Sequence, residues 1–232
     1  MRRRIDSVLV RNQWLNTDSM HVNKKETSGA GKSAERRTQA ERSESTRGAL
    51  VQAARGLFAE HGFAGVGTEE IVRTAGVTRG ALYHHFEDKR DLFEAVYVQI
   101  EAELAEQIAA GALAANAESP LEAMRAGAEM FLQACTEPEA QRIVLLDGPS
   151  VLGWDRWREI AAEYGLGLIE ASLQAAIDAG AIAEQPVAPL AHVLMGALDE
   201  AAMLVARAED PERMQGEVGQ TLDSLLAALS AD

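Results

Sequence analysis

The sequence is short of several residue types, and each shortage excludes a class of protein. It has a single cysteine, Cys135, which excludes a disulfide framework within the chain and fits a reducing compartment. No stretch approaches the roughly 18 uncharged apolar residues that a membrane-spanning helix needs. The basic start is followed by an apolar run that is too short for a signal peptide. We therefore expect a cytoplasmic protein with no membrane partner.

Aromatic residues and prolines are also scarce, and this shortage bears on the fold class. Aromatic residues make up 5% of the 232 residues and there are 6 prolines, whereas Ala, Leu and Glu are abundant. These abundant residues favour helices and disfavour a large sheet. With 47% hydrophobic residues, the chain can build the core of one medium-sized domain or two small ones. The composition therefore predicts an all-α fold.

Positive charge is scarce overall, but it is concentrated in the first part of the chain. The formal net charge is -14. Residues 1–90 nevertheless hold 16 Lys and Arg against 11 Asp and Glu, whereas residues 91–232 hold 6 against 25. Such an asymmetry indicates a segment that faces nucleic acid, attached to an acidic body.

The first 42 residues have no periodic apolar face and are rich in Arg, Lys, Ser, Asn, Gly and Glu. This composition predicts a disordered N-terminal arm. Such an arm can add nonspecific affinity for DNA, or it can reach into a minor groove. The alternative is a disordered tail with no role in binding.

From residue 43 onward, apolar residues recur at helical spacing. Gly62 is expected to end the first helix as its C′ residue. Thr68, Thr78 and Asp88 are suitable N-caps for the three helices that follow. The last of these is expected to run to about Gly111.

The second half of the chain is also predicted to be helical, with one interruption. Helices are expected over residues 120–135 and 139–146, and Gly148 and Pro149 are expected to break the pattern over residues 147–154. The later helices are expected from Trp154 to Gly180, from Pro186 or Pro189 to Val205, and from Pro211 to Leu229.

Two short helices around Gly76 form the pattern of a helix-turn-helix. Gly76 permits the tight turn, and Val77 and Leu82 are expected to pack the two helices together. In this motif the second helix enters the major groove by its N-terminal end. Thr78 and Arg79 occupy that end, where an Arg side chain can donate two hydrogen bonds to guanine.

The residues that follow suit the DNA backbone. Gly80 has no Cβ and permits close approach, and Tyr83, His84 and Lys89 are placed for phosphate contacts. Adjacent residues on a helix point about 100° apart, so His84 and His85 cannot chelate one ion together. We therefore expect neither a metal nor another cofactor.

The stretch RGALVQAARGLFAEHGFAGVGTEEIVRTAGVTRGALYHHFEDKRDLFEAV, residues 47–96, resembles the DNA-binding domain of the TetR (tetracycline repressor) family of bacterial regulators. The resemblance implies a helix-turn-helix domain over residues 43–90 and a helical ligand-binding and dimerisation domain over residues 91–232. Arg47, at the start of the first helix, would touch a phosphate. The full set of implied DNA contacts is Arg47, Thr68, Thr78, Arg79, Gly80, Tyr83, His84, His85 and Lys89.

Apolar and aromatic side chains of the second domain are candidates for an effector pocket, because such pockets are mostly apolar and aromatic. The alternative is that they form the structural core, as a stripe of Met at helical spacing usually does. The candidates are Met124, Phe131, Cys135, Trp154, Trp157, Tyr164 and Met195.

The last two helices have long apolar faces that could meet their copies in a homodimer, as a four-helix interface. The alternative is that these faces are buried within one chain. The helix-turn-helix itself favours a dimer, because tight binding uses two half-sites about one helical turn apart. The candidate interface residues are Leu190, Leu194, Leu198, Ala201, Val205, Val218, Leu222, Leu225 and Leu229.

These observations predict a transcriptional regulator rather than an enzyme. It would be a repressor that a small-molecule effector releases from a palindromic double-stranded DNA operator. An active site is suggested by Asp147, Ser150 and Asp155, but the sequence has no nucleophile elbow and no base at a recognisable spacing. The alternative function is a helical interaction module that retains the fold without binding DNA.

Overall fold

The computed structural model describes residues 30–114 and 117–230. Contacts divide the chain into two units, residues 1–42 and residues 43–232. The described part of the second unit is helical, apart from one isolated β-bridge between Ile182 and Ser230. The all-α prediction is therefore confirmed.

The first described helix is longer than the sequence predicts. Helix α2 (Ala30–Gly65) begins within the segment that was expected to be disordered. Residues 30–42 contain Ala, Glu, Arg and Gln, which are strong helix formers, so a helix continues here without an apolar face. Residues 1–29 lie outside the described residues. Gly62 interrupts regular helical geometry with φ 70° and ψ 164°, as predicted.

The two short helices have the predicted turn between them. Helix α3 spans Thr68–Thr74 and helix α4 spans Arg79–His85, and Gly76 between them has φ 68°. Thr78 is the N-cap of α4, and its side-chain oxygen accepts a hydrogen bond from the backbone N–H of Ala81 at 3.2 Å. The N-cap of α3 is Gly67 and not Thr68, so that prediction was one residue too late.

Helix α5 (Lys89–Ala114) begins after the predicted N-cap Asp88, with a variant of a capping box. The side chain of Asp88 accepts a hydrogen bond from the backbone N–H of Asp91 at 2.9 Å. The Asp91 side chain in turn accepts one from the backbone N–H of Glu87 at 3.0 Å. Both bonds are local, so they set the first turn of α5 independently of the rest of the fold.

A shared core holds α2, α3, α4 and the start of α5 together. Leu50, Phe58, Ile71, Leu82 and Phe93 are fully buried in it. Burial of such a side chain contributes roughly 1.5–3 kcal/mol to stability. The core therefore fixes which side of α4 faces outward.

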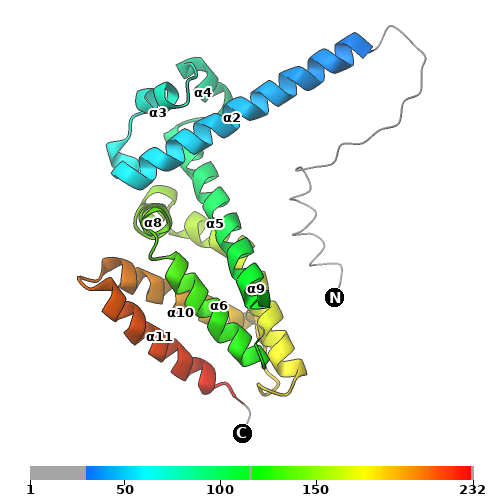
Figure 1. The fold of residues 1–232 in the computed structure, drawn as a ribbon, viewed down its shortest axis with the longest axis vertical. Coiled ribbons are helices and arrows are strands. Elements are labelled where there is room, and N and C mark those ends of the chain that lie inside the picture. The colour runs from blue at the N-terminus through cyan, green and yellow to red at the C-terminus, as the bar shows by residue number, and fades with distance from the viewer. Residues whose placement is uncertain (1–29, 115–116, 231–232) are drawn as a thin grey trace. The chain divides into compact units, whose positions relative to one another are not determined.

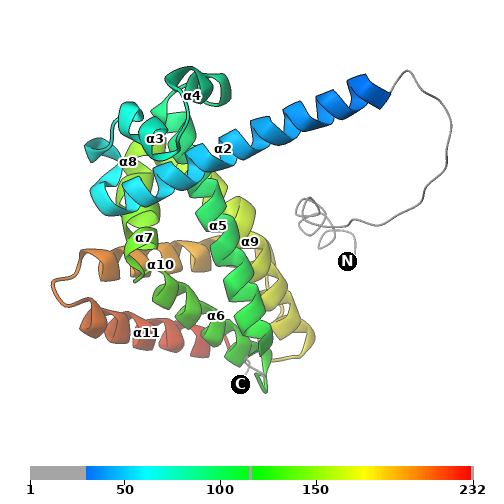
Figure 2. The same ribbon diagram turned by 45° about the horizontal axis from the view of Figure 1, so that its top comes forward.

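The rest of the chain forms a second group of helices (Figures 1 and 2). Helix α5 extends into it and packs against α6 and α9, while α10 packs against α9 and α11. The remaining elements are α6 (Pro120–Ala134), α7 (Pro138–Ala140), η1 (Gln141–Asp147), α8 (Gly148–Leu152), α9 (Trp154–Asp178), α10 (Val187–Arg207) and α11 (Pro211–Ala227).

The segment between α6 and α9 differs most from the sequence prediction. Element η1 is a π-helix, a rare form that often occurs at functional sites. Gly148 and Pro149 then begin α8 instead of breaking the helical pattern, because proline is tolerated in the first turn of a helix. A Cβ at Gly148 would lie 2.9 Å from the Trp157 ring, so only glycine permits this packing. The break falls at Gly153, which has φ 82°.

By length and composition alone, helix α10 could span a membrane. No other helix among residues 30–114 and 117–230 meets the same criteria. It contains Asp199 and Glu200 and packs against α9 and α11, with Ala202 and Val205 in the core. These are the properties of a core helix in a helical domain.

Candidate functional site

Helix α4 presents a polar surface whose direction is set by the buried Leu82 on its other side. Thr78, Arg79, Gly80 and Tyr83 lie on the outside of this helix. Tyr83 is 47% exposed, which is unusual for a large aromatic side chain. These residues therefore form an open surface that a partner molecule can reach.

The structure brings the start of α3 onto the same surface. A guanidinium nitrogen of Arg79 lies 3.3 Å from a carboxylate oxygen of Glu69, and the guanidinium carbon lies 5.6 Å from the centroid of the Tyr83 ring. Hydrogen bonding with Arg79, and then with Thr68, lowers the pKa of the Tyr83 hydroxyl. We define Thr68, Thr78, Arg79, Gly80 and Tyr83 as the recognition surface.

Three further residues with implied DNA contacts lie around the C-terminal end of α4, and one of them, Arg47, is in the middle of α2 and not at the start of the first helix as predicted. Arg47 is exposed, with its guanidinium carbon 5.3 Å from the centroid of the Phe86 ring. His84 is exposed and His85 is half-buried, and their rings meet edge to face at 5.1 Å. Among the residues that the structure describes, no group of three or more His, Cys, Asp or Glu could hold a metal ion.

Lys89 is half-buried, and its ammonium group has partners within the protein. Its ammonium nitrogen donates hydrogen bonds to the carbonyl oxygens of Phe63 at 2.8 Å and Val66 at 2.9 Å, and lies 4.0 Å from the centroid of the Phe63 ring. Its burial lowers its pKa. Lys89 therefore joins the end of α2 to the start of α5. The phosphate contact that spacing and resemblance both indicated stays a prediction.

Two polar contacts join the end of α2 and the start of α5 to the segment between α6 and α9, and sequence reasoning missed them. The backbone N–H of Phe63 donates to the Asp147 carboxylate at 2.7 Å. A guanidinium nitrogen of Arg90 donates to the carbonyl oxygen of Leu152 at 2.6 Å. Both connect the N-terminal helices to η1 and α8, across separations of 84 and 62 residues.

Arg55 strengthens this connection from the middle of α2. Its guanidinium binds the Glu139 carboxylate at 2.6 Å and the Glu103 carboxylate at 2.8 Å. The partners come from α5 and α7. Arg55 therefore connects α2 to both α5 and α7.

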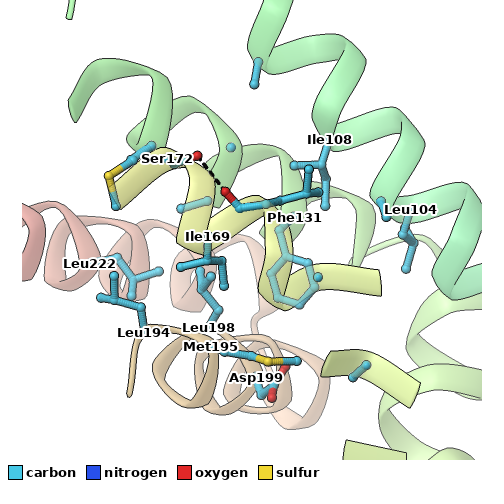
Figure 3. Close-up of a pocket in the computed structure, with 18 of the residues that line it drawn as sticks. Leu104, Ile108, Phe131, Ile169, Ser172, Leu194, Met195, Leu198, Asp199 and Leu222 are labelled. Carbon is cyan, nitrogen blue, oxygen red and sulfur yellow. Dashed lines mark hydrogen bonds between the residues drawn. The ribbon is translucent and has the colours of Figure 1, made fainter. Parts of the chain in front are cut away.

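The second group of helices encloses a mainly apolar cavity of about 180 Å³ between α5, α6, α9, α10 and α11 (Figure 3). An engineered cavity of similar size, about 150 Å³, holds a benzene molecule in another protein. The cavity is lined by Glu101, Leu104, Ala105, Ile108, Ala109, Ala112, Ala123, Met124, Gly127, Ala128, Phe131, Val144, Leu145, Trp157, Ala161, Gly165, Leu168, Ile169, Ser172, Leu194, Met195, Leu198, Asp199, Leu222, Leu225 and Leu226.

Four of the seven candidate effector residues line this cavity, namely Met124, Phe131, Trp157 and Met195. The other three lie elsewhere. Trp154 is 57% exposed, Cys135 is buried in the core, where burial raises the pKa of its thiol, and Tyr164 packs against that core. The spacing of Trp154 and Trp157 in the sequence does not indicate which of the two side chains faces the cavity.

The polar lining of the cavity was not predicted. Asp199 forms an ion pair with Arg158, and burial raises its pKa to about 6. Burial also raises the pKa of Glu101 to about 7. The Ser172 hydroxyl donates to the carbonyl oxygen of Leu168 at 2.9 Å (Figure 3). The sequence signal that could have indicated a buried Asp199 is its place within the largely apolar stretch VLMGALDEAAMLV, residues 193–205.

Most of the proposed dimer residues face inward within one chain. Ala201, Val205, Val218 and Leu222 are buried, and Leu190 and Leu229 pack against a buried cluster. Leu194, Leu198, Leu222 and Leu225 line the cavity. The apolar faces of the last two helices are therefore packing faces. Most of their residues are buried within one chain, which was the alternative to a dimer interface.

The outward side of the same two helices carries different residues. Val193 is 67% exposed and Leu204 is 46% exposed, and both lie on α10. The candidate interface residue Leu225 on α11 borders the cavity but is also 48% exposed, so it belongs in part to this outward side. The pattern alone could not separate the two faces, because α10 is apolar on both.

Comparison with known proteins agrees with this architecture. Residues 50–96 match the family described as bacterial regulatory proteins, tetR family, and residues 121–229 match the family described as tetracyclin repressor-like, C-terminal domain. These matches cover the recognition surface and most of the cavity. The chain belongs to the TetR family of transcriptional regulators and carries the DNA-binding domain of that family.

Individual relatives support the same assignment. The crystal structure of a TetR-family transcriptional regulator from Pectobacterium atrosepticum is 34% identical and has a TM-score of 0.73, covering 83% of this chain and 97% of that one. The Transposon Tn10 TetC protein of Escherichia coli is 33% identical over 133 residues, or 57% of this chain and 66% of TetC. The transcriptional repressor BepR of Brucella suis is 51% identical over 61 residues, 26% of this chain. That alignment spans 29% of BepR.

Proposed function

We propose that this protein is a cytoplasmic homodimeric repressor that binds a palindromic DNA operator and leaves it when a small molecule occupies the cavity. The observation that carries the proposal is the recognition surface, where the side chains of Arg79 and Tyr83 are exposed on a short helix anchored by Leu82. Tertiary packing orients this helix outward, and its N-terminal end is the part that enters a major groove in this motif.

The contacts on the recognition surface suggest how DNA would be bound. In the free protein Arg79 is paired with Glu69 and lies over Tyr83. An exposed ion pair of this kind contributes little stability, so Arg79 can exchange Glu69 for a guanine edge. Thr68 and the Tyr83 hydroxyl would then be available for phosphate oxygens.

A dimer is part of the proposal because one such helix reads only one half-site. The outward side of α10 and α11 is the face that we assign to the partner, with exposed Val193 and Leu204 and small residues such as Gly196 between them. Small residues permit close approach of helices. The two copies of α4 would need to lie about 34–36 Å apart, one turn of DNA.

Coupling between cavity and DNA would use two connections. Helix α5 lines the cavity with Leu104 and Ile108 and starts at Lys89, beside the recognition helices. Element η1 lines it with Val144 and also carries Asp147, which accepts the Phe63 N–H. A ligand that binds one arrangement of these elements more tightly than the other would shift the population toward it.

Selection of random DNA by the purified protein at physiological salt tests the proposal, since low salt inflates nonspecific binding. The expected result is a palindromic motif. The double variant Arg79→Ala and Tyr83→Ala should lose roughly 1–3 kcal/mol of specific affinity at the base that Arg79 contacts. A matched control is Arg213→Ala, which removes an exposed Arg–Glu pair on α11. Absence of any enriched motif from protein refolded free of ligand would refute the proposal.

A further inference from the structure

The polar end of the cavity has an unbalanced charge. Glu101 and Asp199 are the acidic residues in its lining, and among the described residues that line it none is Lys, Arg or His. Arg158, which does not line the cavity, balances Asp199 through an ion pair. Within the part of the chain that the structure describes, no Lys, Arg or His forms an ion pair with Glu101, whose carboxyl group instead shares a hydrogen bond with the Tyr97 side chain.

A carboxylate in this position needs a positive charge or a proton. A buried charge without a partner is strongly unfavourable, so a carboxyl group in an apolar cavity takes up a proton unless a cation is present. Burial, together with the nearby Asp199 carboxylate, raises the pKa of Glu101 to about 7, and the hydrogen bond with Tyr97 offsets only part of this rise. The same site would bind a cation in place of the proton.

We propose that the effector is a small lipophilic amine, whose ammonium group binds against Glu101 while its apolar part fills the space between Phe131 and Met195. The inference rests on the proposed function, because it names the class of ligand for the same cavity. The lining around these residues is apolar, as Figure 3 shows for Leu104, Ile108 and Ile169. An anionic ligand would instead be placed against two carboxylates.

The size of the cavity restricts the ligand further. A volume of about 180 Å³ suits a single aromatic ring with a short chain. Three probes of this size differ in charge but little in shape: 2-phenylethylamine, 2-phenylethanol and phenylacetate. Isothermal titration calorimetry of each probe with the full chain measures binding without any need for DNA.

The expected order of affinity is amine, then alcohol, with phenylacetate weakest. Glu101→Gln should weaken amine binding about tenfold, the usual effect of losing a charged partner, and should change alcohol binding less than twofold. Glu106→Gln is the matched control, since Glu106 is an exposed residue on the same helix. Circular dichroism and thermal unfolding would show that both variants are folded.

The dependence of binding on pH tests the same point without a substitution. The groups that face Glu101 are Tyr97 on α5, Cys135 at the C-cap of α6, Asp199 on α10 and, through its pair with Asp199, Arg158 on α9. Burial raises the pKa values of Tyr97 and Cys135, so both stay neutral at neutral pH. Amine affinity should therefore rise from pH 6 to pH 8 as Glu101 loses its proton, while alcohol affinity should not.

The outcomes separate this inference from the proposed function. Equal binding of amine and alcohol, tighter binding of phenylacetate, or no binding of any probe overturns the amine assignment. DNA selection can still succeed in each of those cases, and the repressor proposal then stands. Amine binding that depends on Glu101 supports the inference even if the selection yields no motif, in which case the repressor proposal alone fails.

Discussion

Replacement of Lys89 by methionine separates a structural role from a DNA contact. Methionine keeps the apolar stem of the side chain and removes the ammonium group, which binds the carbonyl oxygens of Phe63 and Val66 at 2.8 and 2.9 Å. Hydrogen bonds to a charged group contribute about 1.5–3 kcal/mol each. Burial lowers the pKa of Lys89, so desolvation offsets part of this gain. We therefore expect a loss of about 2 kcal/mol in the free energy of unfolding.

Two assays check this prediction. Urea unfolding followed by circular dichroism should show a lower midpoint for Lys89→Met. The slope of log affinity for DNA against log salt concentration should be unchanged, whereas each lost phosphate contact lowers that slope by about 0.9. Arg47→Ala is the comparison, because Arg47 is exposed and is expected to lower the slope without changing stability. A lower slope with an unchanged midpoint for Lys89→Met would refute the structural role and support the phosphate contact.

Two further predictions concern the buried carboxylates and the contact between domains. Glu101 and Asp199 have folded-state pKa values raised to about 7 and about 6 from 4.5 and 3.8, so the stability they contribute is present at low pH and is lost as pH rises through those values. The free energy of unfolding should therefore fall as pH rises from about 4.5 to 8. Glu101→Gln should make this fall smaller. A wild-type curve as flat as that of the variant would contradict the burial of Glu101. Asp147→Asn weakens the acceptor of the Phe63 N–H. It should retain operator binding but show at least severalfold weaker release by 2-phenylethylamine in fluorescence anisotropy, and full release would show that η1 does not carry the coupling.

Structural features that depend only on nearby residues in the sequence, such as helix ends and helix caps, could be predicted. Gly62, Gly76 and Gly180 have positive φ where the helical pattern required a break. Asp88, the predicted N-cap, accepts a capping hydrogen bond at the start of α5. Each of these depends on backbone geometry within a few residues, so the local sequence contains the necessary information.

Features that depend on distant segments were not open to prediction. Lys89 has a phosphate-compatible side chain, but its ammonium group binds carbonyl oxygens 23 and 26 residues earlier in the chain. Nothing in the spacing of the basic residues distinguishes these two uses. The contact between Phe63 and Asp147 spans 84 residues and was equally hidden.

The sequence by itself determined the helical fold, the helix-turn-helix and the outward position of Arg79 and Tyr83, because periodicity and caps are local properties of the chain. Only the tertiary structure decided which apolar face of α10 is buried, with Val205 inside and Val193 outside. It also decided that Glu101 and Asp199, 98 positions apart in the sequence, line one cavity. An apolar stripe shows that a helix packs, but the partner against which it packs is set by the arrangement of all the helices around a common core.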